Sequence, residues 1–333
     1  MKLFHDRRTR TCDDDNGSGA VVQAELSLDL WHAPVAPGHT EEGTMAISTD
    51  ASTAEAGAPR TLLIGDMALE CRVVGAGESV MLVHGSVVAD AFAPLLSEPS
   101  LGDRFQLVIY HRRGYAGSTH PERPLTVAEH AADCGALMDA LGIDRAHIVG
   151  HSLGGAIALQ FALDAPDKVQ SLTLLEAGPM PVPSVQQFAE GLSALGGMYV
   201  AGQKAEAIDA FERAVVGPDY RLGLDRAVPG WFDQAVGDAD TFFAQELPAM
   251  QEWRFSREDA ARISQPVLVV TGSDSATLWP GFREAYDLQR EWLPQAEGFV
   301  LPNATHGMQM QNPRDLAEAL TKFLALHPLS VRA

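Results

Sequence analysis

The sequence predicts an α/β protein with a mostly parallel twisted sheet flanked by helices. First, its short apolar runs lack polar alternation, which is typical of strands that are covered on both faces. Second, these runs alternate with helix-compatible segments along most of the chain. Third, the stretch from Gly150 to Gly154 reads G-x-S-x-G and stands between an apolar run and a small-residue, helix-compatible run. Strand, tight turn and helix in this order are typical of a catalytic serine turn.

Composition and charge narrow the class of protein. The chain has 333 residues, of which 46% are hydrophobic and 20% charged, as in an ordinary globular protein. Its net charge of −20 argues against a nucleic acid or an anionic membrane as partner, so we expect a small-molecule substrate. The sequence gives no indication of oligomeric state. Three scattered cysteines, no apolar run long enough to span a membrane and no secretory pattern favour a cytoplasmic protein.

The chain divides into three regions by composition. Residues 1–60 are rich in small and polar residues without a sustained apolar period, which predicts a disordered N-terminal extension. Residues 61–180 and 264–333 carry the predicted α/β core. Its first six strands are expected at 61–64, 67–74, 80–83, 105–110, 146–149 and 169–175, with the first two forming a hairpin. A helix is expected at 126–141, between Thr126 as N-cap and Gly142 as C-cap.

Residues 181–263 show no strand pattern and are predicted to form a helical lid inserted between the sixth and seventh strands. Its large apolar side chains are expected partly to line a pocket beneath it. Helices are expected at 185–195, 204–216, 238–253 and 256–263. The sheet then resumes at 266–272 and 298–301, and a helix at 314–326 closes the fold.

The G-x-S-x-G turn predicts a nucleophilic serine. Gly150 and Gly154 remove the clashes that side chains would make in so tight a turn, and Ser152 is raised above the sheet. The helix that follows places the N–H of Leu153 where a negative oxygen could form. In serine enzymes of this architecture, the second such N–H lies just past a glycine after an early strand. That pattern is His84-Gly85 here, which leaves Ser86 and Val87 as candidates, and we favour Ser86.

Serine requires a base, and the best-placed histidine is His306, directly after the last predicted strand. In a parallel sheet, this loop lies at the same edge as Ser152. The remaining histidines lie in the N-terminal extension, on surface helices or beside other motif residues, as His84 and His151 do.

From about residue 61 to 328, the sequence resembles the α/β-hydrolase fold family. The matching motifs are His84-Gly85, Arg113-Gly114 with Gly117-Ser118, Gly150-His151-Ser152-Leu153-Gly154-Gly155 and His306. The resemblance implies Ser152 as nucleophile and His306 as base. Two positions depart from the family: His111 stands where Asp is frequent, and Ala116 where Gly is frequent.

The acid that would orient His306 has two candidates. The family usually places an aspartate about three residues past the glycine that ends the seventh strand, but that position is Ser275, and Asp274 stands one residue earlier. Other members carry the acid after the preceding strand, where this chain has Glu176. We favour Glu176 because its position requires no shift of register, with Asp274 as the alternative.

The motifs predict a serine hydrolase that cleaves a small, largely apolar ester or related acyl substrate through an acyl-enzyme on Ser152. The resemblance implies that dehalogenases and epoxide hydrolases of this fold carry an aspartate as nucleophile. The serine at this position therefore disfavours both chemistries. No metal-ligand set or phosphate loop is apparent, so no cofactor is expected. One alternative is a cofactor-free perhydrolase or haloperoxidase-like enzyme that uses the same residues. Another is a non-catalytic ligand-binding protein of the same fold.

Overall fold

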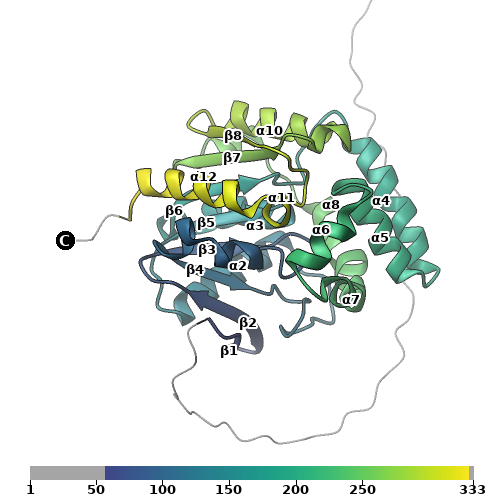
Figure 1. Ribbon diagram of the computed structural model, residues 1–333, viewed down its shortest axis with the longest axis horizontal. Coiled ribbons are helices and arrows are strands. Elements are labelled where there is room, and N and C mark those ends of the chain that lie inside the picture. The colour runs from purple at the N-terminus through teal and green to yellow at the C-terminus, as the bar shows by residue number, and fades with distance from the viewer. Residues whose placement is uncertain (1–56, 330–333) are drawn as a thin grey trace, which may run out of the picture. The chain divides into compact units, whose positions relative to one another are not determined.

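A computed structural model describes residues 57–329, so the predicted extension lies almost entirely outside the described residues. Eight strands form one sheet in the order β1-β2-β4-β3-β5-β6-β7-β8 (Figure 1). β1 and β2 form the predicted hairpin and run antiparallel, and every pair from β4 to β8 is parallel. The mostly parallel sheet is therefore confirmed. The strands are β1 (Arg60–Ile64), β2 (Met67–Val74), β3 (Glu78–Val83), β4 (Phe105–Tyr110), β5 (Ala146–His151), β6 (Val169–Leu175), β7 (Val267–Gly272) and β8 (Glu297–Leu301).

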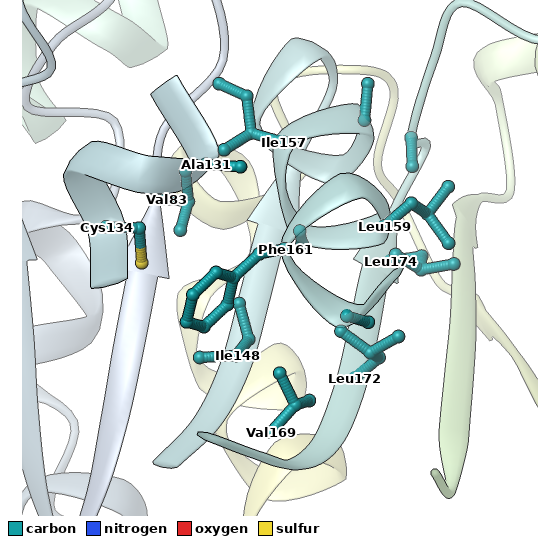
Figure 2. Close-up of a cluster of buried hydrophobic side chains, with 14 of the residues drawn as sticks. Val83, Ala131, Cys134, Ile148, Ile157, Leu159, Phe161, Val169, Leu172 and Leu174 are labelled. Carbon is teal, nitrogen blue, oxygen red and sulfur yellow. The ribbon is translucent and has the colours of Figure 1, made fainter. Parts of the chain in front are cut away.

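Both faces of the sheet are buried, which explains the unbroken apolar runs. In β3, Met81 and Val83 contribute to one hydrophobic cluster, whereas Val80 and Leu82 contribute to another on the opposite face. The first cluster packs beneath α2 (Val127–Ala140) and α3 (Leu153–Asp164), and Figure 2 shows its side chains between α3 and the strands. The second packs beneath α12 (Pro313–Leu326) and the short helices η1 (Ala93–Ser97) and α1 (Pro99–Gly102).

The helix termini follow local sequence signals. Thr126 caps α2 through a reciprocal capping box with Glu129, as the predicted N-cap requires. Gly142 follows the end of the helix at a φ of +70°, a conformation that glycine adopts without steric cost. α12 begins at Pro313, one residue before the predicted start.

The segment between β6 and β7 is helical, and Figure 1 shows α4–α8 grouped together beside the sheet. The helix expected at 204–216 forms close to its predicted bounds. The helix expected at 185–195 extends to residue 200, the one expected at 256–263 covers only 257–260, and 238–253 is divided into a π-helix and a short α-helix. Two helices, α6 and α7, were not predicted because each is short and is separated from its neighbours by glycine and proline. The elements are α4 (Val185–Val200), α5 (Lys204–Val215), α6 (Tyr220–Ala227), α7 (Trp231–Gly237), the π-helix η3 (Thr241–Glu246), α8 (Leu247–Glu252) and α9 (Arg257–Ala260).

Between β7 and β8 lies α10 (Gly281–Trp292), preceded by the 3₁₀ turn η4 (Ser275–Thr277), and α11 (Met308–Gln311) follows β8. The short 3₁₀ turn η2 (Pro166–Lys168) precedes β6. α10 buries Phe282, Ala285, Tyr286 and Gln289 at helical spacing. α10 and α11 place Phe282 and Met310 beside the loop that carries His306.

Candidate active site

Ser152 occupies a strained turn between β5 and α3. Its backbone has φ of +53° and ψ of −122°, which a non-glycine residue adopts only when the surrounding structure enforces it. A Cβ on Gly150 would lie 2.3 Å from the carbonyl oxygen of Gly154, and one on Gly154 would lie 2.1 Å from that of Val83. Both positions therefore require glycine, for the reason that the motif predicts.

The turn is fixed against the end of β6. The amide of Ser152 donates to the carbonyl oxygen of Leu175 at 3.0 Å, and its own carbonyl accepts from the amide of Gly178 at 3.1 Å. Glu176 stands between these two residues at a φ of +42°, directly after β6. The same strand end thus holds both the serine backbone and the glutamate.

His306 and Glu176 form a buried pair. Nδ1 of His306 donates to Oε2 of Glu176 at 2.8 Å. Oε1 of Glu176 accepts from the hydroxyl of Thr271 at 2.8 Å and from the amide of Gly272 at 2.9 Å, so both carboxylate oxygens are satisfied. Because Nδ1 carries the proton, Nε2 of His306 is left as the basic nitrogen.

Asp274, the alternative acid, lies apart from this pair. It is exposed, and its side chain accepts from the hydroxyl of neighbouring Ser273 at 3.2 Å. Ser275, the position at which the family usually places its acid, is fully buried. The structure therefore brings Glu176 to His306 and leaves Asp274 in solvent.

Two aromatic rings lie against the imidazole of His306. Phe282 stacks on it with ring centroids 4.7 Å apart, and the ring of His151 lies at 4.6 Å. Nε2 of His151 donates to the carbonyl oxygen of His306 at 2.8 Å. Burial holds the pKa of His151 well below its usual value, so this residue stays neutral and acts as a fixed donor.

The loop after β3 lies against the serine turn. A Cβ on Gly85 would be 2.9 Å from Cβ of Ser152, so only glycine permits this approach. The amide of Val87 donates to the hydroxyl of Tyr115 at 3.2 Å. The amide of Ser86 donates to no acceptor within residues 57–329.

Arg112 anchors this loop and was not predicted as a site residue. It is 1% exposed, and its guanidinium donates to the carbonyl oxygens of His84 at 3.0 Å and Gly85 at 2.8 Å. It also forms an ion pair of 2.6 Å with Glu246, whose other oxygen accepts from the hydroxyl of Tyr115 at 2.7 Å. Glu246 is separated from Arg112 by more than a hundred residues, so the sequence gives no signal for their pairing. The only sequence signal for Arg112 is its position next to the Arg113-Gly114 motif.

Within residues 57–329, no group of three or more His, Cys, Asp or Glu side chains is arranged to hold a metal ion. In that same part of the chain, no helix is both long and apolar enough to cross a membrane.

Comparison with known proteins identifies the family of the chain. The model of the alpha/beta hydrolase fold family matches residues 78–313, so the chain belongs to that family. Its curated relatives include a dehalogenase and several proteins named as hydrolases, and an α/β-hydrolase enzyme is therefore the class that the fold and the comparisons support.

Two relatives match over most of their length. A fluoroacetate dehalogenase from a Burkholderia species is 29% identical, and the match covers 80% of this chain and 93% of the relative. The 2-(acetamidomethylene)succinate hydrolase of Mesorhizobium japonicum is also 29% identical, covering 80% of this chain and 94% of the relative. Among solved structures, the enol-lactonase from Burkholderia xenovorans has a TM-score of 0.68 at 20% identity, with 80% of this chain and 100% of that one covered.

Proposed function

We propose that this protein is a serine hydrolase that cleaves a small, largely apolar ester or a related acyl substrate through an acyl-enzyme. The observation that carries the proposal is the buried 2.8 Å pair between His306 and Glu176, which leaves Nε2 of His306 without a hydrogen-bonding partner among residues 57–329. Ser152 and His306 both follow strands of the parallel sheet, at the same edge. The serine favours acyl transfer over the dehalogenation after which one relative is named.

In the proposed mechanism, His306 takes the proton of the Ser152 hydroxyl as the serine oxygen attacks the substrate carbonyl. Glu176 stabilises the imidazolium that forms and keeps its orientation. The amides of Leu153 and Ser86 donate to the negative oxygen. Collapse expels the alcohol with a proton from His306, and water then attacks the acyl-enzyme with His306 again as base.

We further propose that residues 181–263 act as a lid. They contact the loops that carry the candidate site: the hydroxyl of Thr305 donates to the carbonyl oxygen of Val216, and the hydroxyl of Thr241 donates to that of Gly114. Lid residues such as Phe242 share one hydrophobic cluster with Val87 and with Phe282, which stacks on His306. These apolar surroundings support an apolar substrate.

The test is hydrolysis of p-nitrophenyl esters of increasing chain length by the wild type and by Ser152→Ala. We expect turnover by the wild type and covalent labelling by a fluorophosphonate probe, both abolished in Ser152→Ala, with chain-length preference reporting the size of the pocket. Ser264→Ala, at an exposed position outside residues 181–263, is the matched control and should retain full activity. A wild type that neither hydrolyses any ester nor takes up the probe contradicts the proposal.

A further inference from the structure

Glu212 differs from every other buried carboxyl in the described part of the chain. It is 3% exposed, yet its carboxyl has no hydrogen-bonding or ionic partner among residues 57–329. Burial alone shifts the pKa of this carboxyl. The other buried carboxyls are each held by an arginine, a histidine or backbone amides: Asp133, Glu176, Asp238 and Glu246. A buried polar group without a partner is costly, and such groups concentrate at binding sites.

Glu212 lies in the middle of the buried stripe of α5. Ile208, Phe211 and Val215 occupy the same face at helical spacing, so the carboxyl stands where an apolar side chain would pack. This stripe belongs to the cluster that also contains Val87 from the loop after β3 and Phe282.

Glu212 lies one helical turn before a residue that contacts the loop carrying His306. Val216, one turn after Glu212, accepts a hydrogen bond from Thr305 through its carbonyl oxygen, and its side chain would be 3.0 Å from a Cβ on Gly307. Thr305 and Gly307 are the residues directly before and after His306. Four residues of α-helix span only about 6 Å along the axis, so Glu212 lies within one turn of a residue that contacts this loop.

The protonation state of the Glu212 carboxyl indicates which groups it can bind. Burial raises the pKa of Glu212 to about 8, so at neutral pH it is mainly uncharged. A protonated carboxyl offers one O–H donor and one carbonyl acceptor. No lysine, arginine or histidine within the described residues pairs with this carboxyl. An uncharged polar group can therefore hydrogen-bond to it without any charge being buried.

We propose that Glu212 anchors an uncharged oxygen-bearing group, such as a ketone or an amide, on the otherwise apolar acyl substrate. The hydrogen bond to this group selects substrates that carry it at one position along the chain. This inference rests on the proposed hydrolase function, which it extends by naming the substrate class.

The experiment compares pairs of p-nitrophenyl esters that differ only by a ketone placed at successive positions along the acyl chain. The enzymes are the wild type, Glu212→Gln, Glu212→Leu and, as control, Glu206→Leu, which changes an exposed glutamate on the same helix. We expect the wild type to prefer one keto ester over its plain partner by about tenfold to a hundredfold in kcat/KM, the effect of one hydrogen bond in an apolar pocket.

Glu212→Gln, which retains a donor and an acceptor, should keep that preference, and so should Glu206→Leu. Glu212→Leu should lose it, so that its kcat/KM values for the keto ester and the plain ester become equal. The inference is overturned if Glu212→Leu keeps the preference, if the wild type favours no keto position, or if Glu212→Gln loses the preference as Glu212→Leu does.

A binding measurement tests this inference independently of the proposed hydrolase function. The p-nitroanilide analogues of the same acids are titrated calorimetrically into Ser152→Ala, with and without Glu212→Leu. Tighter binding of the keto analogue that depends on Glu212 supports the inference even if the wild type hydrolyses no ester. Equal affinities for the keto and plain analogues contradict it.

Discussion

At the scale of single residues, two carboxylates compete for one role, and their surroundings differ sharply. Glu176 is buried with both oxygens bonded, whereas Asp274 is exposed. We predict that Glu176→Gln lowers kcat/KM by ~10³–10⁴-fold, because an amide cannot stabilise the imidazolium of His306. Asp274→Asn should stay within about twofold of the wild type, since exposed polar substitutions perturb little.

The measurement is ester hydrolysis at saturating and limiting substrate, with circular dichroism as a check that both variants fold. A collapse of activity in Asp274→Asn with Glu176→Gln unaffected would reverse the assignment of the acid.

The serine turn and the histidine could be predicted because their signals are local. Gly150 and Gly154 mark the turn whatever the rest of the chain does, and His306 lies in the loop that follows the last apolar strand. The acid could not be fixed from sequence, because the loops of Glu176 and Asp274 open at the same edge of the sheet. Only the path of each loop, which brings the glutamate to His306 and turns the aspartate to solvent, distinguishes them.

At the scale of elements, a buried ion pair links the π-helix η3 to the loop after β3. Arg112 holds the carbonyl oxygens of His84 and Gly85, and Glu246 holds Arg112. We predict that Glu246→Leu destabilises the fold by about 3–5 kcal/mol, because it leaves the arginine charge buried without a partner. Activity should fall as well, since the loop beside Ser152 loses its anchor.

Urea unfolding measures the first effect and ester hydrolysis the second. Combining Glu246→Leu with Arg112→Met should recover part of the lost stability, because the unpaired charge is gone. Glu318→Leu removes an exposed ion pair with Arg314 and serves as control, with an expected change below about 1 kcal/mol. A loss in the control as large as that in Glu246→Leu would contradict a specific role for the buried pair.

The strands of the core were predictable as elements, since their apolar runs are continuous and turn residues bound them. The helices between β6 and β7 were harder. In α6, only Tyr220 and Leu224 are buried, and in α7 only Trp231 and Ala235, so neither gives a long enough period to stand out. The pairing of Arg112 with Glu246 had no sequence signal, because it depends on how distant segments pack.

At the scale of the whole molecule, Glu212 connects the candidate site to the stability of the fold. Its pKa lies near 4.5 when unperturbed and rises to about 8 in the folded protein. At a pH between these two pKa values, Glu212 is deprotonated in the unfolded chain and protonated in the folded protein. Folding stability therefore falls as pH rises through this window, by up to ~1.4 kcal/mol per pH unit.

We predict that Glu212→Gln removes this penalty. Compared with the wild type, the variant should be equally stable near the lower end of the window and more stable by about 3 kcal/mol at neutral pH, an upper value because the unfolded chain is not fully solvated. Urea unfolding of both proteins across the window measures the difference. Glu206→Gln, on the exposed face of α5, should show no such trend. A stability difference for Glu212→Gln that does not change with pH would mean that the carboxyl is ionised in the folded protein. The uncharged partner proposed for it would then be wrong.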